Sequence, residues 1–126
     1  MDTKARLLPR LALALVTALA AGAGWAQPAY PAKPIRVIVA FAPGGIADFA
    51  ARSVSQKLAE ILGVPVIVEN RPGAGGITGG EVVARSAPDG YTLLVTSISH
   101  TINPSVRKNM PFDAVRDFAP VTLITD

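Results

Sequence analysis

Apolar and polar residues follow two different patterns along the chain, and the change from one to the other predicts strands and helices in turn. Short runs rich in β-branched residues at 35–41, 64–69 and 91–96 predict strands, and the first run is apolar nearly throughout, which is typical of a strand covered on both faces. Between the first two runs, apolar residues recur at the spacing of an amphipathic helix, and they are Phe49, Ala50, Val54, Leu58, Ile61 and Leu62. Gly63 and Pro65 indicate where this helix ends.

A second and weaker helix is predicted from about residue 77 to residue 86, with Val83 and Ala84 on its buried side. Gly79 and Gly80 each disfavour that helix by about 1 kcal/mol relative to alanine. We therefore expect them to permit the close approach of a ligand or of the sheet.

The order strand–helix–strand–helix–strand, with connections too long for hairpins, predicts an α/β fold with a parallel sheet and right-handed crossovers. Beyond the third strand, Asn103-Pro104 is expected to open a short helix, and residues 118–125 return to a strand pattern. Because the sequence stops within that pattern, we interpret residues 27–126 as an incomplete domain.

The first 26 residues have the pattern of a secretory signal peptide. A basic start is followed by an apolar stretch at 11–21, and small residues stand at the −3 and −1 positions before Gln27. The apolar stretch is shorter than the roughly 20 residues of a spanning helix. We expect export to the periplasm, with no lipid anchor, since no cysteine follows the stretch, and no membrane insertion after cleavage.

The charge of the chain lies largely in this leader. The whole sequence has 12 Lys and Arg against 9 Asp and Glu, whereas 9 basic and 8 acidic residues remain without the leader. This balance argues against a nucleic-acid partner. The absence of cysteine excludes disulfides and thiolate sites, and a single histidine argues against a metal site, so no metal or other cofactor is predicted.

Three loops rich in glycine or in hydroxyl side chains follow the predicted strands, at residues 42–45, 71–76 and 96–101. The carboxyl ends of parallel strands form the edge at which open α/β sheets bind ligands, and helix N-termini there favour anions. The loops therefore predict a small-molecule site, with a carboxylate as the favoured ligand. Asp48 has two open interpretations: a first-turn charge that complements the helix dipole, or an acceptor for a ligand hydroxyl, amide or ammonium.

Enzymatic alternatives find weaker support in the same loops. The second loop departs from the G-x-G-x-x-G spacing and lacks the lysine of a P-loop. No G-x-S-x-G elbow accompanies His100, so a hydrolase is not indicated. A small dinucleotide- or phosphate-binding enzyme and a gene remnant without a binding role stay as alternatives to a non-enzymatic binding protein.

Five motifs occur in order along the chain: YPAKPIR from Tyr30, FAPGG with Asp48, VENRPGAGG from Val68, APDGYTL from Ala87 and DFAPV from Asp117. With these motifs the chain closely resembles the Bug family, the periplasmic substrate-binding proteins of tripartite tricarboxylate transporters. The resemblance covers residues 30–125.

The resemblance implies a two-lobed "Venus flytrap" of the periplasmic binding protein type II fold, with residues 27–126 as part of its first lobe. It also implies a small ligand of tricarboxylate, dicarboxylate or amino acid type, which is handed to permease subunits in the membrane. By position, the site residues would be Phe41, Pro43, Gly44, Gly45, Asp48, Gly75, Gly76, Ser97, Ser99, His100 and Thr101. Since members resembling this chain are longer, we expect the 126 residues alone to bind weakly or not at all.

Overall fold

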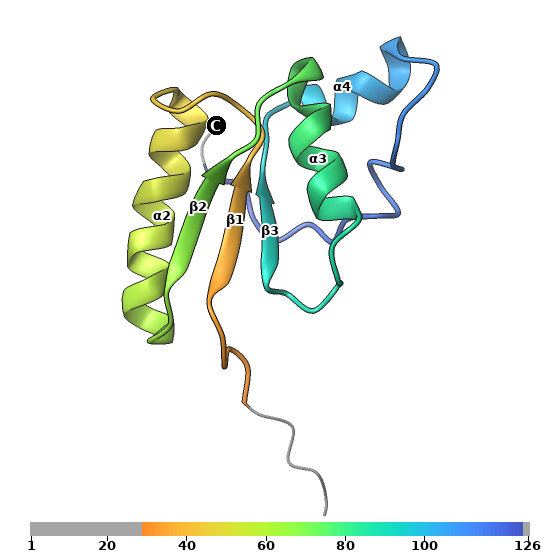
Figure 1. Cartoon of the computed structure of the whole chain (residues 1–126). Helices are drawn as coiled ribbons and strands as arrows, with labels where there is room; N and C mark the ends of the chain where they lie inside the picture. Colours follow the sequence, from red (N-terminus) through yellow and green to blue (C-terminus); the bar gives the residue numbers. More distant parts are fainter. Residues whose placement is uncertain (1–28, 125–126) are drawn as a thin grey trace, which may run out of the picture.

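The computed structural model describes residues 29–124, which form a three-stranded sheet flanked by helices (Figure 1). The predicted α/β class is therefore confirmed, whereas the predicted signal peptide lies outside the described residues. In chain order the elements are β1 (Ile35–Val39), α2 (Ile46–Leu62), β2 (Val66–Asn70), the 3-10 turn η1 (Ala74–Gly76), α3 (Ile77–Ala84), β3 (Thr92–Val95) and α4 (Ser99–Val106).

The sheet has the order β2-β1-β3, and both pairings are parallel, as predicted. Val37 of β1 stands opposite Val68 of β2 and Leu93 of β3. The central strand is the best buried, with Ile38 and Val39 fully inaccessible. A strand enclosed by two neighbours and covered on both faces needs apolar residues throughout, which explains the near-continuous β-branched run.

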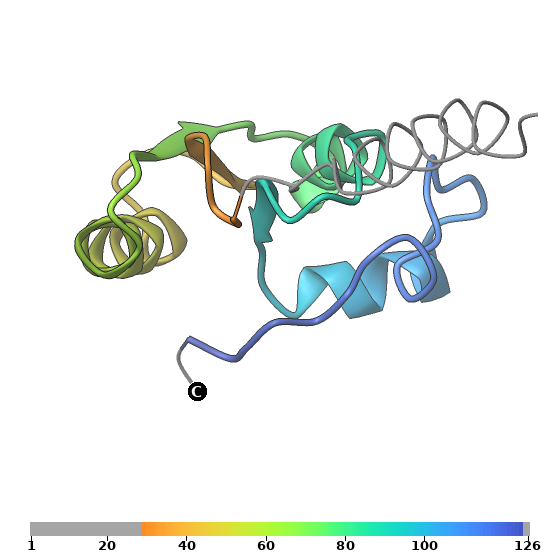
Figure 2. The same cartoon turned by 90° about the horizontal axis from the view of Figure 1, so that it is seen from below.

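The two longer crossovers place α2 and α3 on opposite faces of the sheet, and α4 lies beyond β3 (Figure 2). On the α2 side, Ala51 packs onto Val37 and Val39 at the centre of the core. Side chains of consecutive strand residues alternate between the faces, so Ile38 and Ala40 lie on the α3 side.

Helix α2 ends as predicted, because Gly63 adopts the left-handed conformation at φ 68° and its N–H donates to the Ala59 carbonyl. The predicted buried face is wrong in part. Phe49 is 74% exposed and Ile61 is 71% exposed, and Val54 is also exposed, whereas the buried residues of the helix are Asp48, Ala51 and Ser55. Short side chains let the helix lie close to the β-branched sheet, and larger apolar residues remain on its outer side.

Close approach accounts for both glycines of α3. A Cβ added to Gly79 would lie 2.8 Å from the Cα of Ala40, so the helix rests on the end of β1. A Cβ added to Gly80 would lie 2.7 Å from the ring of Phe112. The groups that lie close to these two glycines are therefore the sheet and the ring of Phe112. Burial in α3 is concentrated at its start, at Ile77, Gly79 and Gly80, and Val83 and Ala84 are only half-buried.

The chain after β3 departs from prediction in two ways. Helix α4 begins at Ser99 rather than near Asn103, and it holds Pro104 inside it. The strand predicted at 118–125 is wrong over the described residues 118–124, which are irregular. Val121 is 80% exposed there and Leu123 is 76% exposed. An apolar alternation becomes a strand only where another strand's backbone accepts its hydrogen bonds.

No helix within residues 29–124 has both the length and the apolar character to cross a membrane.

Candidate functional site

The three loops that follow the strands meet at the carboxyl edge of the sheet, at the arrowhead end of the strands in Figure 1. Gly76 marks the meeting point. A Cβ added to it would lie 3.5 Å from the Cβ of Ala40, 3.6 Å from Ser99 Oγ and 3.7 Å from Phe41 Cζ. Residues more than 20 positions apart in the sequence thus converge, as the parallel topology predicts.

The first loop leads into α2 without a side-chain cap. Pro43, Gly44 and Gly45 are exposed, and Gly44 has a φ of 83° that suits glycine. Gly45 is the N-cap residue and has no side chain to accept a hydrogen bond from the helix. The first N–H groups of a helix have no partner within it, so this terminus offers donors and a partial positive charge.

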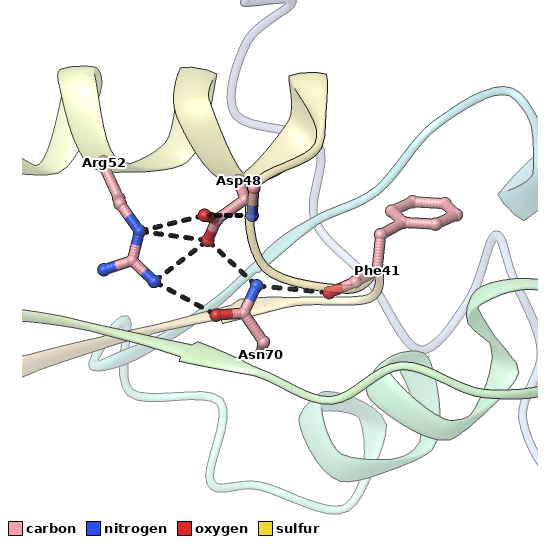
Figure 3. A network of polar contacts seen from close by, with 5 residues as sticks. Phe41, Asp48, Arg52 and Asn70 are labelled. Atoms are coloured by element: carbon pink, nitrogen blue, oxygen red, sulfur yellow. Dashed lines mark hydrogen bonds and ion pairs between the residues drawn. The ribbon is translucent and has the colours of Figure 1, made fainter.

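Asp48, in the first turn of α2, is the most buried polar residue of the site, at 5% exposure. Its Oδ2 accepts a hydrogen bond from the Gly44 N–H at 2.9 Å, and its Oδ1 accepts one from Asn70 Nδ2 at 2.9 Å (Figure 3). Arg52 Nε donates to both oxygens, at 3.1 and 3.0 Å. The hydrogen bond from Arg52, followed by those from Gly44 and Asn70, holds the pKa of Asp48 far below its usual range.

Asn70, the last residue of β2, connects this carboxylate to the first loop. Its Nδ2 also donates to the Phe41 carbonyl at 3.1 Å, and its Oδ1 accepts from Arg52 Nη2 at 3.1 Å. The charge of Asp48 in turn raises the pKa of Arg52, chiefly through their hydrogen bond. Three separate elements are therefore joined by one polar network.

The second loop has an unusual backbone. Gly73, Ala74, Gly75 and Gly76 all have positive φ, and the value of 50° at Ala74 is the one that a glycine would adopt at less cost. The Gly75 carbonyl accepts a hydrogen bond from Asn103 Nδ2 at 3.0 Å. Since Asn103 is 8% exposed and belongs to α4, this bond ties the second loop to the third.

The third loop is short, because its second half forms the first turn of α4. Ser97 Oγ lies 3.0 Å from Ser99 Oγ and accepts a weak hydrogen bond from the Ser99 N–H at 3.3 Å. Thr101 Oγ1 donates to the Ile98 carbonyl at 2.9 Å. Ser97 and Thr101 are exposed, so their hydroxyls lie within reach of solvent and of a ligand.

His100 has different surroundings from the serines beside it. Its ring stacks on Phe112 at 5.7 Å with an interplanar angle of 14°, and it meets Phe118 edge-on at 4.7 Å. Its Nε2 lies 3.2 Å from the Ala114 carbonyl, which it can reach as a donor. These contacts join α4 to the segment that follows it.

Three residues that organise the site were not predicted from the sequence. Arg52 stands four positions after Asp48 on one helix, and this spacing could have revealed the pair. Asn70 and Asn103 donate hydrogen bonds to residues 22 and 28 positions away in the sequence, and no local sequence pattern indicates such contacts.

The site is an open wall over the described part of the chain. Among residues 29–124 no group of three His, Cys, Asp or Glu side chains is placed to hold a metal ion. One surface hollow, of about 400 Å³, lies on the outer side of α2 between Val54, Leu58 and Ile61. Another lies at the amino ends of the strands, beside Lys33 and Thr92. We place the candidate site at the loops because three elements converge there, whereas the hollow on α2 is lined by a single helix.

Comparison with known proteins gives a consistent result. The profile of the family described as "Tripartite tricarboxylate transporter family receptor" matches residues 50–126. Protein BugT of Bordetella pertussis is 42% identical over 120 residues, which are 90% of this chain and 37% of BugT. The chain spans about a third of the length of the curated relatives that it matches.

Two solved structures that share this fold are also similar in sequence. The periplasmic binding protein BugD is 41% identical, with a TM-score of 0.69 over 72% of this chain and 30% of BugD. MatC from Rhodopseudomonas palustris, solved with bound malate, is 36% identical, with a TM-score of 0.71 over 75% of this chain and 33% of MatC. The resemblance read from the five motifs is thereby confirmed: the chain belongs to the tripartite tricarboxylate transporter receptor family, which includes the Bug proteins.

Proposed function

We propose that residues 27–126 form part of the first lobe of a solute receptor and supply one wall of a cleft that binds a small carboxylate. The observation that carries this proposal is the convergence of Phe41, Gly76 and Ser99 from three loops at the carboxyl edge of the sheet. Two related structures support the ligand class, because MatC holds malate and an R. palustris protein 30% identical to this chain was solved with adipate.

The wall offers several kinds of contact to such a ligand. The uncapped start of α2 provides the first N–H groups of the helix as donors, and Gly44 and Gly45 before it let the ligand approach closely. The hydroxyls of Ser97, Ser99 and Thr101 provide further hydrogen bonds, and the remaining members of the wall are Phe41, Pro43, Gly75 and Gly76. Asp48 and His100 are held by internal contacts, and we place them behind the wall, where they support it.

Tight binding by this arrangement requires a second wall. A ligand enclosed by two lobes loses most of its exposed surface and its competing water, whereas one open wall leaves half of it solvated. We therefore propose that these 126 residues bind a dicarboxylate only weakly, in the millimolar range, and that a receptor of the relatives' length binds it far more tightly.

The same proposal gives the protein a location and partners. Since the relatives include periplasmic binding proteins, we place this chain in the periplasm after cleavage behind Ala26, where it delivers ligand to the membrane subunits of a transporter. N-terminal sequencing of the exported product tests the first step. The product should begin at Gln27, and recovery of an uncleaved chain in the cytoplasm would contradict the location.

Binding is tested by titrating malate into the ¹⁵N-labelled chain and following its amide resonances. We expect shifts at Gly44, Gly45, Ser97 and Ser99 that do not saturate below millimolar malate. The neutral diamide of malate serves as the control, because it keeps the shape and removes the charge. Shifts elsewhere, equal shifts with the diamide, or no shift at all would each overturn the proposed wall.

A further inference from the structure

The proposed wall contains a buried carboxylate of its own, which needs an explanation. Asp48 lies in the first turn of α2, close to the helix terminus at which an anionic ligand would bind. Two carboxylates close to each other repel, and the repulsion is stronger where little solvent screens them. A carboxylate at this position therefore weakens an anion site unless something cancels its charge.

The hydrogen bonds of Asp48 leave it little capacity to bind a ligand directly. A carboxylate accepts about four hydrogen bonds. The Gly44 N–H and Asn70 Nδ2 occupy one oxygen each, Arg52 Nε contacts both, and Arg52 Nη2 lies 3.0 Å from Oδ1. With 5% of the residue exposed, the carboxylate is turned into the network rather than outward.

The same network holds the first loop at both ends. Asn70 Nδ2 donates to the carbonyl of Phe41, the residue just before the loop, and Asp48 accepts from the N–H of Gly44 near its end. Arg52 fixes the amide of Asn70 by donating to its Oδ1, which leaves the Asn70 amide nitrogen to face its two acceptors. The glycines of the loop are otherwise free to adopt many backbone conformations.

We propose that Asp48, Arg52 and Asn70 are positioning residues of the ligand wall. Asp48 and Asn70 hold the loop so that the start of α2 faces the ligand, and Arg52 cancels the charge of Asp48 so that the wall accepts an anion. The inference about charge rests on the proposed carboxylate site. The inference about the loop concerns the ligand-free chain and is independent of it.

The loop is tested without ligand by hydrogen exchange of individual amides. In Asp48→Ala, we expect the Gly44 amide to exchange at least about tenfold faster, because a lost hydrogen bond to a charged group is worth a factor of this order. Amides of β1 should keep their rates. Asp89→Ala is the matched control, since Asp89 also accepts from a backbone N–H but lies at the other end of the sheet.

Asn70→Ala provides a second route to the same result, should the first variant unfold. It removes the bond to the Phe41 carbonyl and keeps the ion pair between Asp48 and Arg52. We expect the amide resonances of the first loop to shift and broaden while those of α3 do not. Unchanged loop amides in both variants would overturn the positioning role.

The charge is tested with malate and its diamide. Arg52→Met keeps a long side chain but leaves Asp48 uncompensated, so malate binding should weaken about three- to tenfold while diamide binding stays the same. Adding Asp48→Asn to Arg52→Met should restore malate binding, because asparagine can still accept from Gly44 without a charge.

A purely structural network predicts the opposite outcome, namely a double variant that binds no better than the single one. That outcome, or an equal loss for malate and diamide, would overturn the charge inference. Absence of any malate binding by the unchanged chain would overturn both the carboxylate function and the charge inference. The exchange rates of the loop would still decide the positioning role.

Discussion

Each end of the sheet carries a motif that combines proline, glycine and aspartate, and the two motifs make different contacts. The motif FAPGG with Asp48 lies at the carboxyl end, and APDGYTL from Ala87 lies at the amino end. At the amino end, Tyr30 Oη donates to the Gly90 carbonyl at 2.8 Å, and the N–H of Ala32 donates to Tyr91 Oη at 2.8 Å. Lys33 pairs with Asp89 at 3.0 Å and lies over the Tyr91 ring. The segments 30–33 and 89–91 thus form a structural clasp, in which these polar groups bind one another.

The carboxyl end differs because its polar network holds a loop that leads into the start of a helix. Asp48 and Asn70 bind the first loop from behind, and the start of α2 has no side-chain cap. Helix N-termini gather at this edge of a parallel sheet, and helix C-termini gather at the other, where carbonyls repel anions. Proline, glycine and aspartate thus occur together at both edges: beside the start of α2 at the carboxyl edge, where we propose a ligand wall, and in a structural clasp at the amino edge.

The largest expected effect breaks the close packing at the carboxyl end. Gly79→Ala should destabilise the fold by about 1–3 kcal/mol, because overpacking against backbone outweighs the better helix propensity of alanine. The new Cβ would lie 2.8 Å from the Ala40 Cα and 3.1 Å from the Arg71 carbonyl oxygen. Urea denaturation measures the change.

Gly45→Ala is the control for that variant, since its Cβ would meet nothing nearer than the Ala42 carbonyl at 3.7 Å and its φ is −83°. It should change stability by a few tenths of a kcal/mol at most. If Gly79→Ala instead raises the urea midpoint, the close approach of α3 to β1 is wrong.

At the amino end, the expected effect is smaller. Gly90→Ala should cost about 1–2 kcal/mol, because Gly90 has a φ of 79° that alanine adopts only with strain. Gly63→Ala is matched to it, with a φ of 68° and open space around the added Cβ. The difference between the two free energies of unfolding isolates the crowding of the added Cβ at position 90, which would lie 3.2 Å from the ring and the hydroxyl of Tyr30. Equal costs would mean that the tyrosine moves aside freely.

Acid should weaken both ends, and the carboxyl end more. The pKa of Asp48 is lowered by Arg52, Gly44 and Asn70, and that of Asp89 by Lys33 and the Tyr91 N–H. A lowered pKa means that the unfolded chain binds the proton more readily, so each carboxylate stabilises the fold above its ordinary pKa of 3.8 and loses this contribution as the pH falls further.

The urea midpoint should therefore drop as the pH falls from about 5 to about 3. Asp48→Asn should flatten this drop more than Asp89→Asn, because the carboxylate of Asp48 is buried and has more donors. The reverse order of the two variants would contradict the assignment of the stronger network to the carboxyl end.

The smallest expected effect concerns a single hydrogen bond of the clasp. Tyr30→Phe removes the bond to the Gly90 carbonyl and keeps the ring that packs at 4.9 Å from Tyr91. At this exposed position the variant should lower the free energy of unfolding by about 0.5–1 kcal/mol. The malate shifts proposed for the carboxyl end should not change, and a change there would show that the two ends are coupled.

Some parts of the structure could be predicted because one local rule governs them. The run at 35–41 became the buried β1, and Gly63 ended α2, since strand burial and a left-handed helix end each depend on a few adjacent residues. The helical period of α2 was readable too. Its buried side was not, because Phe49 and Ile61 are apolar and yet lie outside the strip that faces the sheet.

The candidate site was predictable only in its outline. Loop positions follow from strand order, and so the convergence at Gly76 could be expected. The aromatic surroundings of His100, and the bonds of Asn70 and Asn103, depend on residues brought together from distant positions. The strand expected at 118–125 failed for the same reason, because strand pairing needs a partner that local pattern does not supply.

By itself, then, the sequence determined the parallel α/β order, the end of α2 at Gly63, the placing of the glycine loops at one edge and membership of the receptor family. The tertiary structure alone decided which side of α2 is buried, that Gly79 meets the sheet, and that Asn70 joins Asp48 to the first loop. The physical reason is range. Periodicity and turn chemistry act over a few residues, whereas burial and long-range hydrogen bonds depend on which distant side chains the fold brings into contact.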